Sequence, residues 1–391
     1  RTDNEYKINY GAGFEHARYT NDAFNRRFLG GEATTLEYDT QLDIFKWSVF
    51  GQVSKKLLNN QLTLSLGARM DANDYDENMR NMLNQFSPRF SAAYNLSPSV
   101  SWTFNTGRFY QLPPYTTLGY QDNEGNFVNR KNNLKYIAAD HIVSGFEYLP
   151  NTNSKLTLEG FFKYYRDYPF SIRDSVAISS KSNDFGTFGD EEVTSSANGR
   201  SYGLELLYRN KDLLGMNVIT SYTLFKSEFK DYAGEYIPTS YDTRHLLNIT
   251  LRRSFKGNWD LGLKWRFVGG RPYTPYDRDK SSLASAYNAR GRAYFDYNRF
   301  NSQWLDPFHQ LDLRVDKQFF FDRWSLMLYL DVQNVYNFQS DEEDVLVREL
   351  NANGQPVTYL DENNQLRYQL NRIESEGSGT VLPSVGIIVE L

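Results

Sequence analysis

Strict alternation of apolar and polar residues is the feature that most restricts the fold of this chain. In residues 324–337, WSLMLYLDVQNVYN, an apolar side chain occupies every second position from Trp324 to Val332. Successive side chains of a β-strand point to opposite faces, so a period of two predicts a strand with one apolar face. The pattern recurs along the whole chain and predicts fourteen strands, whereas helical periodicity is nowhere comparably strong.

The connections between the predicted strands alternate between short and long. Short turns are expected at residues 55–61, 96–99, 150–154, 210–215, 256–258 and 321–323, and long loops at 30–39, 72–85, 110–135, 171–195, 229–244, 270–309 and 338–381. Bacterial outer-membrane barrels have short periplasmic turns and longer extracellular loops, whereas a soluble sandwich has no reason to gather its long loops at one end. The sequence therefore predicts an all-β, transmembrane, antiparallel up-and-down barrel in the bacterial outer membrane, with its apolar face toward lipid.

Composition agrees with a barrel and excludes other classes of protein. The chain has 29 Tyr and 27 Phe, and its apolar face carries aromatic residues near the strand ends, which is typical of the aromatic girdles of such barrels. The net charge of −5 provides no basic field, so no nucleic-acid partner is expected. No run approaches ~18 apolar residues, which excludes a membrane-spanning helix.

The sequence contains no recognisable catalytic or metal-binding motif. Cysteine is absent, and the four histidines, His16, His141, His245 and His309, lie on different strands without the spacing of a metal site. The one Gly-x-Ser-x-Gly match, GRSYG (199–203), lies inside a segment predicted to be a strand, so it lacks the strand–turn–helix context of a nucleophile. We therefore expect no enzymatic activity, no cofactor and no bound metal.

Several segments resemble the barrel of a TonB-dependent outer-membrane receptor. The stretch 86–115 resembles the family's Ser-Pro-Arg strand with its turn and return strand, and GRSYGLELLYR (199–209) resembles its Gly-x-Glu strand. Residues 241–253 and the FVGGRPYTPYD segment (267–277) are similar to a later strand and turn of the family. Residues 309–319, 328–337 and 382–391 look like its last three strands.

This resemblance implies a Gram-negative receptor that imports a scarce nutrient, such as a metal–siderophore chelate, with energy from the TonB complex. The family has a 22-stranded barrel and an N-terminal plug. The chain, residues 1–391, is thus expected to be one barrel segment with 14 strands, and the plug and first strands would lie outside it. Outer-membrane lipid and lipopolysaccharide are expected partners. The alternatives are a complete 14-stranded passive channel for small or hydrophobic solutes, and a soluble β-protein that binds extracellular polymers.

One long loop combines cationic and aromatic side chains and is the candidate ligand site. Guanidinium groups and aromatic rings suit an anionic, ring-bearing ligand such as a catecholate chelate, although the same residues could order the loop, pack on the plug or bind lipopolysaccharide phosphates. The candidates are Arg271, Tyr273, Tyr276, Arg290, Arg292, Tyr294, Tyr297, Arg299 and Trp304. A second loop contains the acidic run DEED (341–344), which we interpret as part of a solvated acidic hairpin rather than a calcium site.

Overall fold

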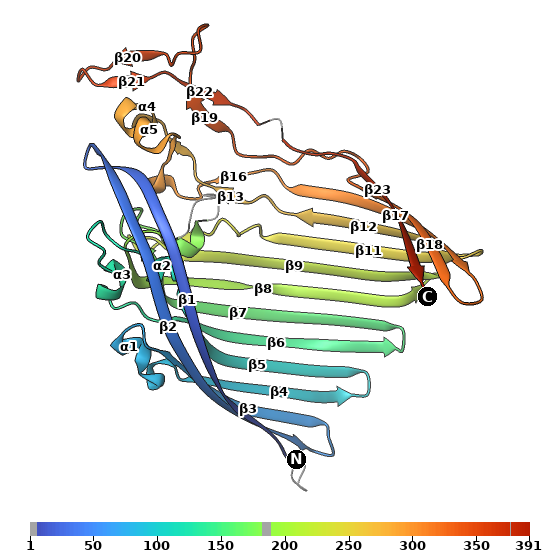
Figure 1. Ribbon diagram of the computed structural model, residues 1–391. Coiled ribbons are helices and arrows are strands. Elements are labelled where there is room, and N and C mark those ends of the chain that lie inside the picture. The colour runs from blue at the N-terminus through green and yellow to red at the C-terminus, as the bar shows by residue number, and fades with distance from the viewer. Residues whose placement is uncertain (1–5, 182–188, 376) are drawn as a thin grey trace.

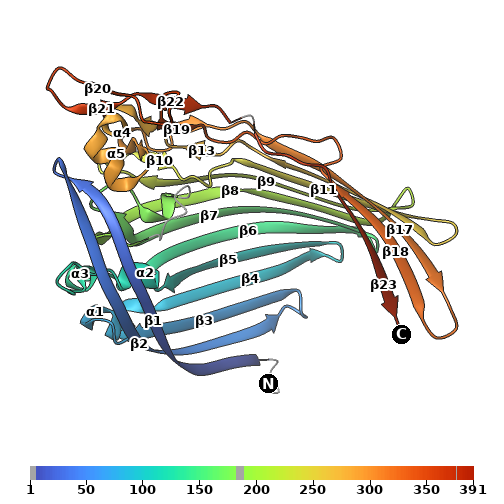
Figure 2. The same ribbon diagram turned by 45° about the horizontal axis from the view of Figure 1, so that its top comes forward.

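One large curved antiparallel sheet forms most of the molecule (Figures 1 and 2). The computed structural model describes residues 6–181, 189–375 and 377–391. In these ranges fourteen strands follow one another across the sheet in chain order, and every segment of alternating sequence falls in one of them. They are β1 (Tyr6–Leu29), β2 (Glu32–Leu57), β3 (Leu62–Asn73), β4 (Ser87–Ser97), β5 (Val100–Gln111), β6 (Ile137–Asn151), β7 (Ser154–Ser171), β8 (Val193–Leu213), β9 (Met216–Lys230), β11 (His245–Phe255), β12 (Trp259–Val268), β17 (Phe308–Phe320), β18 (Ser325–Gln333) and β23 (Leu382–Glu390).

The smaller elements lie in the long connections. They are the strands β10 (Tyr236–Pro238), β13 (Pro272–Tyr273), β14 (Tyr276–Asp277), β15 (Tyr294–Phe295), β16 (Gln303–Trp304), β19 (Val345–Arg348), β20 (Thr358–Leu360), β21 (Leu366–Tyr368) and β22 (Leu370–Ile373), the α-helices α1 (Glu77–Arg80), α2 (Tyr115–Leu118), α3 (Val128–Lys131), α4 (Arg278–Ser282) and α5 (Ala284–Arg290), and the 3₁₀ helices η1 (Met82–Gln85), η2 (Ile178–Ser180) and η3 (Tyr297–Arg299). Within the described ranges, no helix has the length and apolar character needed to cross a membrane.

The apolar face of the sheet is exposed instead of being covered by a protein core. Leu204 is 53% exposed, Phe146 is 50% exposed and Leu328 is 40% exposed. A monomeric soluble protein rarely leaves a continuous apolar surface of this size open to water. A barrel wall in lipid does so along every strand, because outward apolar residues alternate with inward polar ones. The leucines of β18 therefore lie on the lipid-facing side.

The long connections gather at one end of the sheet, as the sequence predicts, with one exception. The predicted loop at residues 30–39 is wrong, because β1 and β2 continue to a two-residue turn formed by Gly30 and Gly31. Both glycines have positive φ, +61° and +89°, which side chains rarely adopt. The predicted loop at 171–195 includes residues 182–188, which lie outside the described ranges.

The protein core lies at the end with the long connections, where loop elements cover the inner face of the sheet. Ile44 of β2, Met79 of α1 and Leu118 of α2 are completely buried in one cluster with Leu134. Figure 1 shows α1, α2 and α3 together at this end of the sheet. The connections are therefore a packed layer that can position side chains accurately.

The sheet is not a closed barrel in the described residues. The strands β1 and β23 are its two edges and do not pair with each other, and they lie apart in both overall views (Figures 1 and 2). An unpaired edge in lipid would leave backbone groups without partners at a cost of several kcal/mol each.

Candidate functional site

A cavity of about 880 Å³ opens among three segments that are far apart in the sequence. Its walls are the tip of β1 (residues 24–30), the β7–β8 connection (residues 173–181 and 189–191), and the β12–β17 connection (residues 277–298). All three belong to the end of the sheet with the long connections. Seven basic and five acidic side chains line the cavity, together with five aromatic rings. A space of this size and composition can hold a small polar ligand.

A buried network of ion pairs supports one wall. The ammonium group of Lys181 lies 2.7 Å from a carboxylate oxygen of Asp174 and 2.7 Å from one of Glu191. Arg173 reaches the same two carboxylates at 3.0 and 3.4 Å. Burial opposes ionisation of Asp174, but the hydrogen bond from Arg173 and the charge of Lys181 outweigh it and lower the pKa of Asp174 to about 2. Asp174 is therefore ionised over the physiological pH range, and its ion pairs hold the β7–β8 connection in place.

Aromatic rings of the β12–β17 connection form the adjoining wall. Tyr294 is buried, and its hydroxyl donates a hydrogen bond to the carbonyl oxygen of Ala286 at 2.9 Å. The Tyr297 ring lies 5.4 Å from the Lys181 ammonium group, so the aromatic wall contacts the ion network. Burial, together with the charge of Asp174, raises the pKa of Tyr297, which therefore stays neutral. The aromatic wall and the cations thus lie in one continuous lining.

The β1 tip is fastened to the β7–β8 connection. Arg27 donates a hydrogen bond to the carbonyl oxygen of Asp190 at 2.7 Å and one to the Tyr120 hydroxyl at 3.2 Å. Asn25 donates to a carboxylate oxygen of Asp190 at 2.8 Å. Burial raises the pKa of Asp190, although Arg27 and Arg173 oppose this effect with their charges. The tip of β1 therefore supplies the third wall of the cavity.

Four of the nine candidate residues line this cavity, namely Arg290, Arg292, Tyr294 and Tyr297. The other five lie elsewhere in the same loop. Two of them form ion pairs: Arg271 lies 3.4 Å from a carboxylate oxygen of Glu343, and Arg299 lies 2.7 Å from one of Asp296. The Tyr276 ring stacks on the Phe295 ring with 5.1 Å between their centroids, and the guanidinium of Arg244 lies 4.4 Å from the centroid of the Trp304 ring. Tyr273 belongs to the short β13–β16 pair. These contacts order the loop, which is one of the roles that the sequence left open for these residues besides ligand binding.

Sequence reasoning overlooked five of the seven basic residues of the cavity. One of them, Lys280, lies in the 277–298 segment itself. The other four, Arg26, Arg27, Arg173 and Lys181, come from two other connections, and nothing in the sequence shows that these connections meet that segment. The dense run of charges in residues 173–191 is the one signal that could have drawn attention to them.

The acidic run 341–344 is tied to its surroundings. Asp341 accepts a hydrogen bond from the backbone NH of Asp306 at 2.9 Å, and Glu343 pairs with Arg271 at 3.4 Å. Asp344 forms an ion pair with Arg372. Among the described residues, no group of three or more histidine or acidic side chains could hold a metal ion. The run thus connects the β18–β23 connection to the preceding long loop. It directly precedes the β19–β22 hairpin, and Asp341 and Glu342 are exposed whereas Glu343 and Asp344 are half-buried, so the run is only partly solvated.

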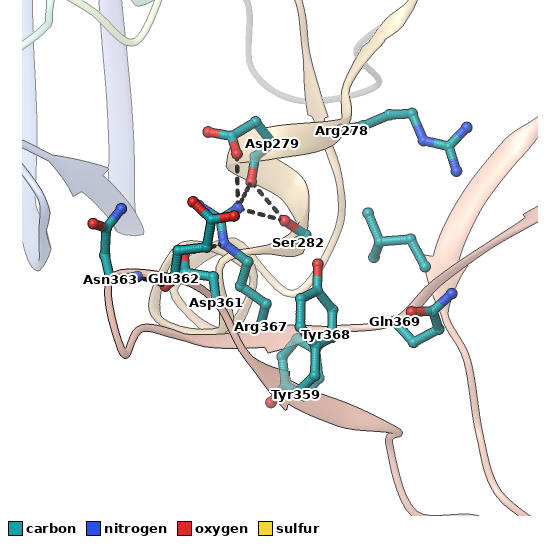
Figure 3. A pocket seen from close by; sticks show the side chains of 11 residues that line it. Arg278, Asp279, Ser282, Tyr359, Asp361, Glu362, Asn363, Arg367, Tyr368 and Gln369 are labelled. Atoms are coloured by element: carbon teal, nitrogen blue, oxygen red, sulfur yellow. Dashed lines mark hydrogen bonds and ion pairs between the residues drawn. The ribbon is translucent and has the colours of Figure 1, made fainter.

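A second cavity, of about 480 Å³, lies where the β20–β21 hairpin rests on α4 (Figure 3). Arg367 of β21 crosses this contact and donates hydrogen bonds to Asp279 and Ser282 of α4 while pairing with Asp361 at 2.6 Å. Figure 3 shows these groups pointing toward one another. All these partners of Arg367 belong to the protein itself. We therefore interpret this cavity as the place where the β20–β21 hairpin packs on α4, rather than as a ligand site.

Comparisons with known proteins place these features in a family. A family profile described as TonB dependent receptor-like, beta-barrel matches residues 1–335. No match is found among curated protein sequences.

Solved structures share the fold. The outer membrane transporter YddB from Escherichia coli has a TM-score of 0.58 at 11% identity, and the match covers 98% of this chain and 51% of YddB. The ferric-catecholate import receptor Fiu from E. coli K12 has a TM-score of 0.58 at 13% identity, over 98% of this chain and 51% of Fiu. The ferric yersiniabactin uptake receptor FyuA from Yersinia pestis has a TM-score of 0.56 at 12% identity, over 100% of this chain and 51% of FyuA.

The chain spans about half the length of these structures, and at such low identity the likeness shows the fold alone. The family profile covers most of the chain, and the members of this family are transporters and receptors. The protein therefore belongs to the TonB-dependent receptor β-barrel family, whose members reside in the outer membrane of Gram-negative bacteria.

Proposed function

We propose that this chain is the barrel segment of a TonB-dependent active importer of a scarce nutrient, such as a metal–siderophore chelate. The ligand would be bound by the long connections and passed to the lumen. The observation that carries this proposal is the cavity of about 880 Å³ at the end of the sheet where the long connections gather. That end faces the cell exterior in bacterial barrels, so a ligand from the medium reaches the cavity directly.

The lining favours an anionic ligand with aromatic or otherwise planar groups. Arg290 and Arg292 present guanidinium groups, whose planar fork suits carboxylate and catecholate oxygens. Tyr294 and Tyr297 add ring surfaces beside these cations. Two proteins of similar fold are described as a ferric-catecholate import receptor and a ferric yersiniabactin uptake receptor, which supports a metal chelate as the class of ligand.

The proposal includes regions and partners outside this chain. About eight further strands would complete a 22-stranded barrel between β1 and β23, and an N-terminal plug would fill it and contact the TonB complex. Outer-membrane lipid and lipopolysaccharide would surround the wall. The unpaired edges of the sheet and the half-length match to solved structures support this arrangement. A complete 14-stranded passive channel is not favoured, because it requires β1 and β23 to pair.

Ligand binding by the full-length receptor in detergent tests the proposed site. The probe is a ferric tris-catecholate chelate, and binding is followed by quenching of intrinsic fluorescence. Arg290→Gln combined with Arg292→Gln should weaken binding roughly tenfold or more, because charge-assisted hydrogen bonds to the chelate are lost. Arg271→Gln is the matched control, since Arg271 belongs to the same loop and pairs with Glu343, and neither residue lines the cavity. Equal losses in both variants would contradict the site.

Growth of a deletion strain tests the class of nutrient. The strain is supplied in turn with catecholate, hydroxamate and citrate iron chelates, with cobalamin, and with oligosaccharides. The proposal expects a defect on one chelate that is restored by the wild-type gene. A defect on none of the metal chelates, with a defect on an oligosaccharide, would reassign the substrate.

A further inference from the structure

A cavity of about 290 Å³ lies in the wall of the sheet, on strands β2 to β6, and is called the wall cavity below. The side chains that line it on β3 and β6 alternate with Leu66 and Ile142, which are 60% and 50% exposed on the lipid-facing side. Successive side chains of a strand point to opposite faces. The wall cavity therefore opens on the inward face, toward the lumen.

Two glycines make room for one arginine at this place. Arg89 of β4 lies directly opposite Gly67 of β3 on one side and Gly107 of β5 on the other. A Cβ atom at Gly107 would lie 3.1 Å from Cγ of Arg89 and 3.0 Å from the carbonyl oxygen of Pro88, both tighter than an ordinary van der Waals contact. The wall cavity is thus the space around Arg89 in which neither neighbouring strand places a side chain beside it.

The Arg89 side chain is held along the wall. Its guanidinium carbon lies 4.5 Å from the centroid of the Phe109 ring, and its Nε donates a hydrogen bond to the Ser87 hydroxyl at 3.3 Å. The centroid of the His141 ring lies 4.6 Å from that of Phe109. The terminal nitrogens of Arg89 donate no hydrogen bond to any residue that the structure describes. The guanidinium is therefore fixed at one edge while its terminal donors stay available.

The charge of Arg89 is not balanced by a carboxylate. Two other arginines of the lumen-facing side have close acidic partners: Arg69 lies 2.6 Å from Asp71, and Arg314 lies 2.9 Å from Asp316. Within residues 6–181, 189–375 and 377–391, no carboxylate lies at ion-pair distance from Arg89. This arginine therefore adds a net positive charge to the lumen wall.

The rest of the lining is also suited to an anion. The ionisable groups among the described lining residues, Arg89 and His141, are both basic. The other polar side chains there are the amides of Gln52 and Asn105 and several hydroxyls, which can donate hydrogen bonds without adding charge. The wall cavity thus combines one fixed cation with neutral donors and has no acidic side chain in its described lining.

We propose that the wall cavity binds one small oxyanion, a carboxylate or a phosphate, at Arg89. The planar fork of a guanidinium matches the oxygens of both groups and forms charge-assisted hydrogen bonds with them. The inference goes beyond the proposed chelate import, because the wall cavity shares no residue with the cavity of the long connections. Its ligand is a free anion in the lumen.

Anion titration of the full-length protein in detergent tests the site. Wild type, Arg89→Gln and Arg89→Lys are titrated with inorganic phosphate and, separately, with acetate, at constant ionic strength with chloride as the balancing anion. Binding is read from the NMR line broadening of the anion. Arg209→Gln is the matched control, since Arg209 of β8 faces the same lumen, has no ion pair in the described part of the chain and does not line the wall cavity.

Wild type and Arg209→Gln should bind both oxyanions equally well, and Arg89→Gln should bind them about tenfold or more weakly, because charge-assisted hydrogen bonds are lost. Arg89→Lys should fall between them, since an ammonium group keeps the charge but lacks the planar fork. This variant keeps the test valid if Arg89→Gln does not fold. Tighter binding of acetate would identify a carboxylate as the natural occupant, and tighter binding of phosphate would identify the inorganic anion.

Two results would overturn the site. One is equal affinity of the Arg89 variants and the Arg209→Gln control. The other is a wild-type protein that binds neither oxyanion. If Arg89→Gln then also lowers the thermal unfolding midpoint, the guanidinium is paired with a carboxylate of the protein outside this chain instead of a free anion. The chelate titration depends on Arg290 and Arg292 and is unaffected by either result.

Discussion

Ile44 and Phe45 are consecutive residues of β2, yet Ile44 is completely buried while Phe45 is 44% exposed. From Phe45 toward the short turn, the apolar residues of β2 lie on the outward face. From Ile44 toward the Gly30–Gly31 turn, they lie on the inward face, where Leu36, Tyr38 and Leu42 are buried beneath loop elements. The apolar side of the strand therefore changes face where the wall leaves the membrane.

Replacement of Ile44 tests this change of face. Ile44→Ala should lower the free energy of unfolding by about 2–4 kcal/mol, because it leaves a cavity in the cluster with Met79 and Leu118. Glu37→Ala, at an exposed position of the same strand, should change it by about 0.5 kcal/mol or less. Urea unfolding in detergent micelles measures both. Indistinguishable midpoints for the two variants would contradict the inward packing of Ile44.

The error at residues 30–39 shows what alternation can and cannot reveal. The stretch LEYDTQLDI (36–44) alternates as regularly as the membrane strands, but its apolar residues are in the opposite phase to Phe45 and Trp47. Two glycines and several polar residues led to the prediction of a loop. Alternation identifies a strand wherever it occurs, whereas the face that meets lipid depends on where the bilayer ends, which a single strand does not record.

The candidate site was predictable only in part. The β12–β17 connection carries its own signal, since arginines and aromatic residues are dense within it, and four of these residues line the cavity. Arg27 and Lys181 line the same cavity because their loops contact the 277–298 segment, which lies about 250 and about 100 residues later in the chain, respectively. Such contacts depend on tertiary packing at the rim, so no local pattern around either residue indicates them.

Substitutions on β18 test which face meets lipid. Leu328→Arg should block assembly of the barrel, because a charge near the middle of the bilayer costs about 2–4 kcal/mol. Tyr329→Arg should be tolerated, since Tyr329 lies on the opposite face, where its ring contacts Arg314 at 4.2 Å. Heat-modifiable migration on gels reports folded barrel for both. Similar assembly of the two variants would show that the faces are assigned incorrectly.

Acidification should loosen the β7–β8 connection through Asp174. The pKa of this carboxyl is lowered from 3.8 to about 2, so its contribution to stability is complete above pH 3.8 and is lost as the pH falls toward 2. The contribution corresponds to roughly 2 kcal/mol. Pulsed hydrogen exchange should show residues 172–181 losing protection over this pH window. In Asp174→Asn the protection should already be reduced at neutral pH and should vary less between pH 4 and 2.

Gly203 should tolerate no side chain, in contrast to another glycine of the wall. A Cβ atom at Gly203 would lie 2.2 Å from the carbonyl oxygen of Leu224 on the neighbouring strand, whereas one at Gly51 would have nothing within 4 Å. Gly203→Ala should therefore destabilise the folded barrel by about 1–3 kcal/mol through overpacking, and Gly51→Ala should leave it nearly unchanged. Thermal unfolding in micelles compares them. A normal midpoint for Gly203→Ala would show that β8 and β9 are less closely packed than described.

A disulfide cross-link across the two edges of the sheet decides between the proposed receptor and a closed channel. Tyr10 of β1 and Ile387 of β23 are 83% and 69% exposed, and in the described residues their strands do not pair. A disulfide requires Cα atoms within about 7 Å, which neighbouring strands satisfy and separated strands do not. If further strands complete the wall, Tyr10→Cys with Ile387→Cys should remain reduced in native membranes. A positive control, Leu328→Cys with Ile387→Cys, joins residues that are directly opposite each other on β18 and β23. Efficient oxidation of the control alone supports the receptor, whereas equal oxidation of both pairs would mean that β1 and β23 close a 14-stranded channel.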